Sequence, residues 1–333
     1  MNRFLLILSL VILISACKEE NKILRGRTMG TTYMINTTGK SAGKELQVKV
    51  DQCLQEINRQ MSAYQPESEI SLFNAKRDTM PFIISPSFGS VLKLARQINL
   101  ESAGAFDVTV APLVDLWGFG RSNNRSAVPE ADAIAETRKR VGMEKLKIIN
   151  DTTIAKINPL IELDLSAIAK GYGVDAVAEL LDREGYENYL VEIGGEIYAR
   201  GDNNGQPWKL GIDRPEFGAV PGQHIEAVIS IGNQAVATSG DYRNYFIDKD
   251  SVFCHTIDPV SGKPIINGVA SVTVVAPDCA LADAMATAIM VMGVDRSLAW
   301  VESNPDVECF IITRVKNGYV EQMSSGFAGL IVN

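Results

Sequence analysis

The sequence predicts an α+β fold in which helices and strands are interspersed along one chain of 333 residues. Apolar residues recur with a helical period in some stretches and with a strand period in others, and the two kinds do not alternate strictly. That order favours a mixed fold over a barrel. No proline- or serine-rich linker divides the chain, and 46% of its residues are hydrophobic, as in a globular protein. We therefore expect one domain, with room for two lobes around a central ligand cleft.

Residues 1–16 have the features of a bacterial signal peptide. Arg3 provides a positive start, and the apolar run from Phe4 to Ile14 is shorter than the about 20 residues that a permanent transmembrane helix needs. The run ends in Ile14-Ser15-Ala16-Cys17, which resembles a lipobox. We expect cleavage before Cys17 and lipidation, including palmitate, at this cysteine. The alternative is a plain signal peptide with a chance cysteine.

A lipid on Cys17 would make residues 17–25 a tether and residues 26–333 a domain held at a membrane surface outside the cytoplasm. Four further cysteines could pair in three ways or remain buried thiols, and they form no C-x-x-C metal pattern. They are Cys53, Cys254, Cys279 and Cys309.

The net charge of −8 argues against a nucleic-acid partner, which would favour a basic surface. It does not exclude a small anionic ligand, because a few placed cations and a metal ion can hold one.

Helical periodicity predicts six helices. The first has Leu46, Val50 and Leu54 near a 3.6-residue period, and the fourth has Val174 and Leu181 on one face. The six ranges are 44–63, 87–101, 130–140, 167–183, 280–292 and 295–303.

Alternating and β-branched stretches predict the strands, with a hairpin around Asn150-Asp151. The ranges are 28–37, 146–149, 154–157, 188–193, 208–213, 226–231, 252–257, 271–276, 307–314 and 318–323.

A glycine motif lies inside the fourth expected helix. Gly171-Tyr-Gly-Val-Asp-Ala176 has the G-x-G-x-x-A spacing of a dinucleotide-binding loop, with Glu192 at the distance of its acidic residue. Such a loop needs an apolar strand running directly into the first glycine. Residues 164–170 precede it instead, with Ser166 placed as a helix N-cap. The sequence therefore favours a helix that begins before the glycines over a Rossmann loop.

Lys170 falls near the start of this helix, where the macrodipole disfavours a cation. Either its side chain extends into water, or Lys170 and the helix N-terminus together face an anion such as phosphate. In the second case Asp164 is placed to bind a sugar hydroxyl or a ring N–H.

Asp283 and Thr287 are four residues apart on the fifth expected helix and share one face. A carboxylate and a hydroxyl are hard oxygen ligands that suit Mg²⁺. The alternative is a solvated Asp beside a Thr that bonds back to the helix. The chain has only two histidines, His224 and His255, which argues against a His-rich zinc site.

Eight segments, in order, resemble the ApbE family, the FAD:protein FMN transferases. They are Met29-Gly-Thr-Thr-Tyr33, Met61-Ser-Ala-Tyr64 with Ser68-Glu-Ile-Ser71, Gly104-Ala-Phe-Asp107 continuing to Leu113-Val-Asp-Leu-Trp-Gly-Phe-Gly120, Asp164-Leu-Ser-Ala-Ile-Ala-Lys-Gly171, Glu192-Ile-Gly-Gly-Glu196, Thr238-Ser-Gly-Asp-Tyr242, His255-Thr-Ile-Asp-Pro259 and Ala282-Asp-Ala-Met-Ala-Thr287.

The resemblance implies a set of site residues. FAD-contacting positions are Met29, Tyr64, Ala105, Phe106, Asp107, Asp164 and Lys170. Mg²⁺ ligands are Asp283, Thr287 and the backbone carbonyl of Ala167, and His255 matches the histidine proposed as a base.

The resemblance also implies a reaction. The FMN moiety of FAD, the substrate, would be joined through a phosphoester to a Thr or Ser of an exported flavoprotein, with Mg²⁺ as cofactor and AMP as product. The family favours the inner membrane. A hydrolase that converts FAD to FMN and AMP, and a lipoprotein that only binds or scavenges flavin, remain as alternatives.

Overall fold

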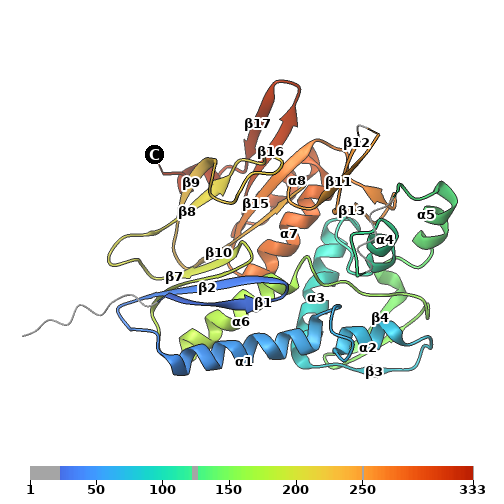
Figure 1. Cartoon of the computed structure of the whole chain (residues 1–333), viewed down its shortest axis with the longest axis horizontal. Coiled ribbons are helices and arrows are strands. Elements are labelled where there is room, and N and C mark those ends of the chain that lie inside the picture. The colour runs from blue at the N-terminus through green and yellow to red at the C-terminus, as the bar shows by residue number, and fades with distance from the viewer. Residues whose placement is uncertain (1–22, 122–126, 250, 333) are drawn as a thin grey trace, which may run out of the picture.

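The computed structural model describes residues 23–121, 127–249 and 251–332. Its main layer is an antiparallel eight-stranded sheet in the order β1-β2-β6-β7-β10-β15-β16-β17 (Figure 1). Its strands are β1 (Ile23–Thr28), β2 (Thr31–Thr38), β6 (Asn188–Ile193), β7 (Glu196–Arg200), β10 (Gln234–Gly240), β15 (Val269–Ala276), β16 (Glu308–Val315) and β17 (Gly318–Met323). Every residue of β15 is buried, because this apolar strand is covered on both faces.

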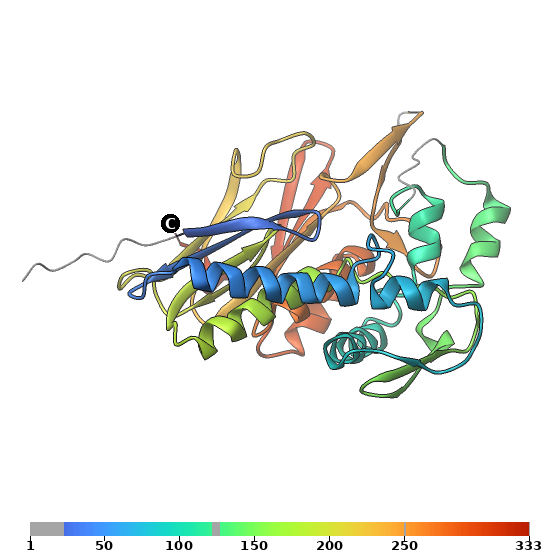
Figure 2. The ribbon, with the colours of Figure 1, turned by 60° about the horizontal axis from the view of Figure 1, so that its bottom comes forward.

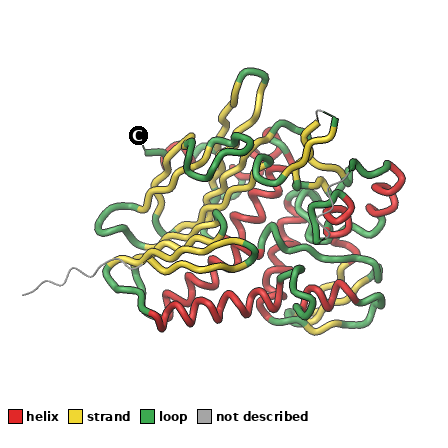
Figure 3. The backbone as a smooth tube through the Cα atoms, in the orientation of Figure 1, coloured by secondary structure: helices red, strands yellow, loops and turns green. Residues whose placement is uncertain are grey.

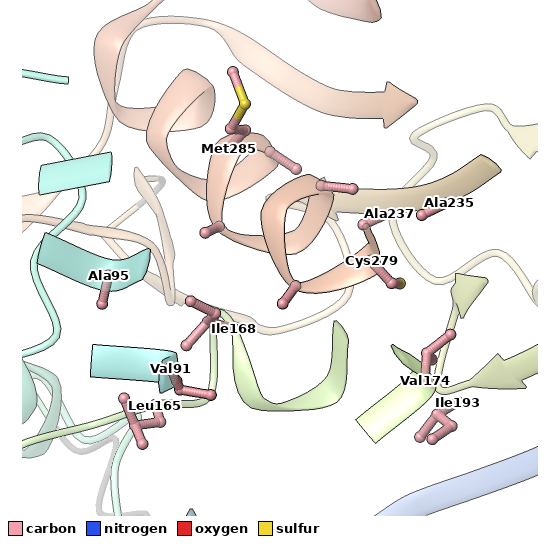
Figure 4. Close-up of a cluster of buried hydrophobic side chains, with 14 of the residues drawn as sticks. Val91, Ala95, Leu165, Ile168, Val174, Ile193, Ala235, Ala237, Cys279 and Met285 are labelled. Atoms are coloured by element: carbon pink, nitrogen blue, oxygen red, sulfur yellow. The ribbon is translucent and has the colours of Figure 1, made fainter. Parts of the chain in front are cut away.

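Helices cover one face of this sheet. They are α1 (Lys44–Met61), α6 (Ala169–Arg183), α7 (Cys279–Met292) and α8 (Val294–Glu302), and α3 (Pro86–Glu101) packs on α1 and α7. α7 packs on β10 and β15, while α6 packs on β6, β7 and α7 (Figure 2). Side chains of α3, α6, α7 and β10 meet in the main hydrophobic core, where Val91, Val174 and Met285 lie (Figure 4).

The opposite face of the sheet is covered by the hairpin of β8 (Trp208–Asp213) and β9 (Ile225–Ile231) and by the short helix η2 (Phe327–Leu330). Phe310 of β16 and Phe327 stack there, with ring centroids 5.3 Å apart. The central strand β15 is therefore buried on both faces, while the outer strands β1 and β17 are partly exposed.

A smaller lobe, rich in loops, lies beside the sheet (Figures 1 and 3). It contains α2 (Glu69–Ala75), α4 (Ala111–Leu116), α5 (Ala131–Arg138), η1 (Met143–Lys145), a sheet of β3 (Phe82–Ile83), β5 (Thr153–Lys156) and β4 (Leu146–Asn150), and the hairpins β11 (Tyr245–Asp248)–β12 (Ser251–Cys254) and β13 (Ile257–Asp258)–β14 (Lys263–Pro264). The predicted α+β class is therefore confirmed.

Most predicted elements are present, but three boundaries were wrong. The expected strand 28–37 is two strands with a turn at Met29-Gly30. The strand 252–257 ends at Cys254, so His255 lies in a connection. α6 begins at Ala169, and Ser166 does not cap it, because the residue at the N-cap position is Ile168.

The predicted signal peptide and Cys17 lie outside the described residues. β1 starts at Ile23, three residues before the predicted domain boundary at residue 26. No helix in the described part of the chain is long and apolar enough to cross a bilayer. Cys53, Cys254, Cys279 and Cys309 are free thiols in the structure.

Candidate functional site

A cavity of about 980 Å³ lies where the end of the main sheet meets the smaller lobe. This volume is at the upper end of the roughly 300–1,000 Å³ of small-molecule sites, as a dinucleotide would require. Four segments line it. Their residues are Arg27–Thr31, Ile57, Asn58, Met61–Gln65, Asp164, Ser166, Ala169, Lys170 and Asn244.

Met29 belongs to the tight turn between β1 and β2. Met29 and Gly30 both have positive φ, 50° and 74°, which is the type I′ turn that suits a two-residue hairpin loop. The Met29 side chain packs against Gly173 of α6, where an added Cβ would lie 2.9 Å from Met29 Cε. The second glycine of the motif in α6 therefore makes room for the cavity wall, and the Rossmann interpretation is not needed.

Tyr64 follows α1 at the edge of the cavity. The segment is held by Ser68, whose Oγ donates a hydrogen bond to the Ser62 carbonyl at 2.7 Å. The Tyr64 side chain is 71% exposed and offers aromatic surface to a ring system in the cavity.

Asp164 is positioned by the hydrogen bonds of the preceding residue, Leu163. The amide of Asn74 both donates to the Leu163 carbonyl (2.8 Å) and accepts from the Leu163 N–H (2.7 Å). Asp164 Oδ1 then accepts the Ser166 N–H at 2.8 Å. Asn74 and Asp164 thus fix the chain that leads into α6.

The Lys170 side chain lies between two buried carboxylates. Its Nζ is 2.7 Å from Glu196 Oε1 and 3.7 Å from Asp283 Oδ2. Burial alone lowers the pKa of Lys170, but the two carboxylates outweigh burial and raise this pKa above its ordinary value. Burial raises the pKa of Glu196, and Lys170 opposes that rise. Lys170 is therefore a fixed cation on the cavity wall.

Asp283, which lies 3.7 Å from Lys170 Nζ, shares a face of α7 with Thr287, and the segment that precedes α6 contains Ala167. Asp283 is 3% exposed, and its Oδ2 accepts the Gly171 N–H at 3.1 Å. In a regular helix this N–H would donate to the Ala167 carbonyl four residues earlier. Because it donates to Asp283 instead, no described residue donates a hydrogen bond to the Ala167 carbonyl. Thr287 Oγ1 is 3.2 Å from Ser239 Oγ on β10. These carboxylate, carbonyl and hydroxyl oxygens fit a hard cation such as Mg²⁺.

His255 is hydrogen-bonded to Asn244, a residue that lines the cavity. Both the backbone N–H and the ring Nδ1 of His255 approach the Asn244 carbonyl, at 3.0 and 3.2 Å. A carbonyl only accepts, so Nδ1 carries the proton and Nε2 carries the lone pair of the neutral ring. The Phe119 ring packs edge-on against the imidazole, with centroids 6.4 Å apart.

Ala105, Phe106 and Asp107 are not brought to the cavity wall. All three are buried, and Phe106 belongs to the main core. The Asp107 carboxylate accepts hydrogen bonds from Thr109 and from the Met143 N–H, and burial raises its pKa. This segment therefore supports the small lobe rather than presenting side chains to the cavity.

The model of the ApbE family matches residues 29–311. The chain belongs to the ApbE family.

Relatives of known name match this chain in sequence over nearly its whole length. A FAD:protein FMN transferase of Vibrio cholerae is 42% identical over 98% of both chains, and one of Haemophilus influenzae is 39% identical over 95% of this chain and 94% of the relative. The structure of the flavin transferase ApbE from Vibrio cholerae has a TM-score of 0.85 at 42% identity and covers 93% of this chain and 99% of that one. The apo flavinyl transferase ApbE of Pseudomonas stutzeri has a TM-score of 0.83 at 34% identity, covering 93% and 97%. The predicted family and the prediction of an enzyme are confirmed.

The sequence analysis missed two residues of this ApbE-family site. Glu196 pairs with Lys170, and the Asn244 carbonyl orients His255. Glu196 is the last residue of the family-like segment Glu192-Ile-Gly-Gly-Glu196, so the sequence did contain a signal for it. Its partner lies 26 residues away on another element, and spacing along the chain does not reveal such a contact.

Proposed function

We propose that this chain transfers the FMN moiety of FAD to a Ser or Thr hydroxyl of an exported flavoprotein. The reaction forms a phosphoester, depends on Mg²⁺ and releases AMP. The names of its relatives support FAD as substrate and a protein as acceptor. The proposal rests mainly on two residues that line the large cavity. Lys170 lies 3.7 Å from Asp283, and the Asn244 carbonyl is hydrogen-bonded by His255.

FAD binding is assigned to the cavity walls. Tyr64 supplies a face for a ring, and Asp164 supplies an acceptor for a sugar hydroxyl or a ring N–H. Lys170 is a permanent cation that can balance one charge of the pyrophosphate. Met29, packed against Gly173 of α6, forms part of the cavity wall.

Asp283, Thr287 and the Ala167 carbonyl would hold Mg²⁺. When bound, Mg²⁺ would withdraw charge from the pyrophosphate and make AMP a better leaving group. Lys170 Nζ pairs with Glu196 Oε1 at 2.7 Å and lies farther, 3.7 Å, from Asp283 Oδ2, so the Asp283 carboxylate would remain available to the metal ion.

His255 is assigned the role of general base. The acceptor hydroxyl oxygen bonds to the phosphorus of the FMN half, and its proton passes to His255 Nε2. The bond from this phosphorus to the bridging oxygen breaks, and the electron pair leaves with AMP. The Asn244 carbonyl holds the ring in the tautomer that can accept the proton.

The test is incubation of the protein with FAD, Mg²⁺ and an exported flavoprotein as acceptor, followed by denaturing gel fluorescence. We expect covalent flavin on the acceptor, and none on an acceptor whose target Ser or Thr is replaced by Ala. Free FMN and AMP without a labelled acceptor would instead support the hydrolase. Unchanged bound FAD would support simple binding.

We also propose that Cys17 is the lipidated N-terminus, which holds the enzyme on a membrane and faces it away from the cytoplasm. The support is the lipobox-like Ile14-Ser15-Ala16-Cys17 after a short apolar run.

A further inference from the structure

Asp175 of α6 caps a different helix. Its Oδ1 accepts the Cys279 N–H at 2.7 Å, and its Oδ2 accepts the Ala280 N–H at 2.8 Å. These are the first two residues of α7. The residue at the N-cap position of α7 itself, Asp278, makes no side-chain capping bond. Two N–H groups of the first turn of α7 are thus bound by a carboxylate from α6.

The contact between α6 and α7 also sets the positions of two candidate metal ligands, Asp283 and the Ala167 carbonyl. At Gly171 the helices approach so closely that an added Cβ would lie 2.3 Å from the Cys279 carbonyl oxygen. The Gly171 N–H donates to Asp283 Oδ2, one helical turn beyond Cys279. Asp283 belongs to α7, while Ala167 belongs to the turn that begins α6. The separation of their oxygens therefore depends on how α7 sits on α6.

We infer that Asp175 is a positioning residue for the metal site: it fixes the first turn of α7 on α6, so that Asp283 and the Ala167 carbonyl reach one cation. The inference rests on the proposed Mg²⁺ site. Mg²⁺ requires oxygen ligands at about 2.0–2.1 Å in near-octahedral geometry, so a small shift of α7 weakens binding. The Asp175 carboxylate binds backbone N–H groups at the first turn of α7 and is not one of the proposed ligands of the ion.

This role accounts for the glycine motif in α6. Gly171 allows the close approach, Gly173 makes room for Met29, and Asp175 caps α7. Cys279 and Val174 lie on these neighbouring helices in the core (Figure 4). The G-x-G-x-x-A spacing thus serves helix–helix contact and not a phosphate loop.

The test measures Mg²⁺ affinity by titration calorimetry on the full chain in detergent, loaded with FAD, together with melting curves without Mg²⁺. Asp175→Asn keeps the size of the side chain but leaves one N–H without an acceptor, and Asp175→Ala removes both. Asp182→Asn is the matched control, because Asp182 also lies on α6 and is bonded by Tyr189 Oη at 2.7 Å, away from α7. Asp283→Ala reports on the site itself.

We expect Asp175→Asn to raise the Kd for Mg²⁺ roughly 10-fold and Asp175→Ala more, within the 10- to 100-fold typical of residues that orient metal ligands. Asp182→Asn should lower the melting temperature and leave the Kd within about twofold. An unchanged Kd in both Asp175 variants, with binding lost in Asp283→Ala, would overturn this inference alone. An unchanged Kd in Asp283→Ala would overturn the proposed metal site and the inference with it.

Discussion

At the scale of single residues, His255 is the group whose removal should separate chemistry from binding. It contacts the Asn244 backbone and the Phe119 ring and is not among the residues that line the cavity. His255→Ala should therefore keep FAD and Mg²⁺ and lose single-turnover transfer by roughly 10²- to 10⁴-fold.

The other histidine provides the control for this measurement. His224 lies in a separate cavity and its ring is hydrogen-bonded to Glu216, so His224→Ala should transfer at the wild-type rate. Equal rates for His255→Ala and the wild type at saturating FAD would remove His255 from the mechanism.

Asp283 carries the charge of the proposed metal site. Asp283→Ala should lose Mg²⁺-dependent transfer far more than it loses stability, because α7 is already formed and packed. Thr287→Ala should be milder, since water can replace a neutral hydroxyl. Asp278→Ala, just before the same helix and without a capping bond, is the control. The measurement is transfer rate against Mg²⁺ concentration, with melting curves. Full activity of Asp283→Ala at ordinary Mg²⁺ would contradict the assignment.

Local sequence pattern was enough to raise three candidate site residues. The four-residue spacing of Asp283 and Thr287 indicated a shared helix face, and the place of Lys170 at a helix start indicated a cation near an anion, while the resemblance assigned their roles. Glu196 and Asn244 were not found, because β7 and the connection before β11 reach the site only through the fold. The burial of Phe106 was likewise not visible, since a motif match does not indicate which way a side chain points.

At the scale of elements, the crossing of α6 and α7 decides the geometry of the site. Gly171→Ala would place a methyl group within 2.3 Å of a backbone oxygen, and backbone cannot move as a flexible side chain can. We expect the free energy of unfolding to fall by about 1–3 kcal/mol, as for overpacked cores. The measurement is urea unfolding. Gly329→Ala, where an added Cβ meets nothing within 4 Å, should stay near wild type. A Gly171→Ala protein as stable as that control would show that the helices can separate without cost.

Long amphipathic helices were predicted well, because α1 and α6 keep a regular apolar face over four or more turns. Several elements were missed, among them β7, β10, β11, α2 and α4. β10 contains Thr238 and Ser239 beside apolar residues and lacks clean alternation, since it lies between two strands with both faces near other elements. The turn at Met29-Gly30 was missed because methionine rarely adopts positive φ.

At the scale of the whole molecule, the anchor and the enzyme should be separable. Cys17→Ser should abolish lipidation and leave an uncleaved or soluble precursor. A form that begins at Lys22 should retain transfer, because β1 stays whole and pairs with β2 from Ile23 onward. A form that begins at Arg25 loses Leu24, which is buried, and should be less stable. Cell fractionation, mass spectrometry and melting curves make the comparison. An unmodified Cys17 in the membrane fraction would refute the anchor.

We propose that this ApbE-family chain couples cleavage of FAD to flavin transfer onto a protein hydroxyl. The most direct measurement is the ratio of AMP released to flavin bound covalently to the acceptor, with quenching of the reaction at successive times. We predict one AMP for each flavin transferred, and almost no AMP when the acceptor is absent or its target hydroxyl residue is replaced by Ala. AMP that forms equally fast without an acceptor, together with free FMN, would contradict the account and identify the chain as a hydrolase.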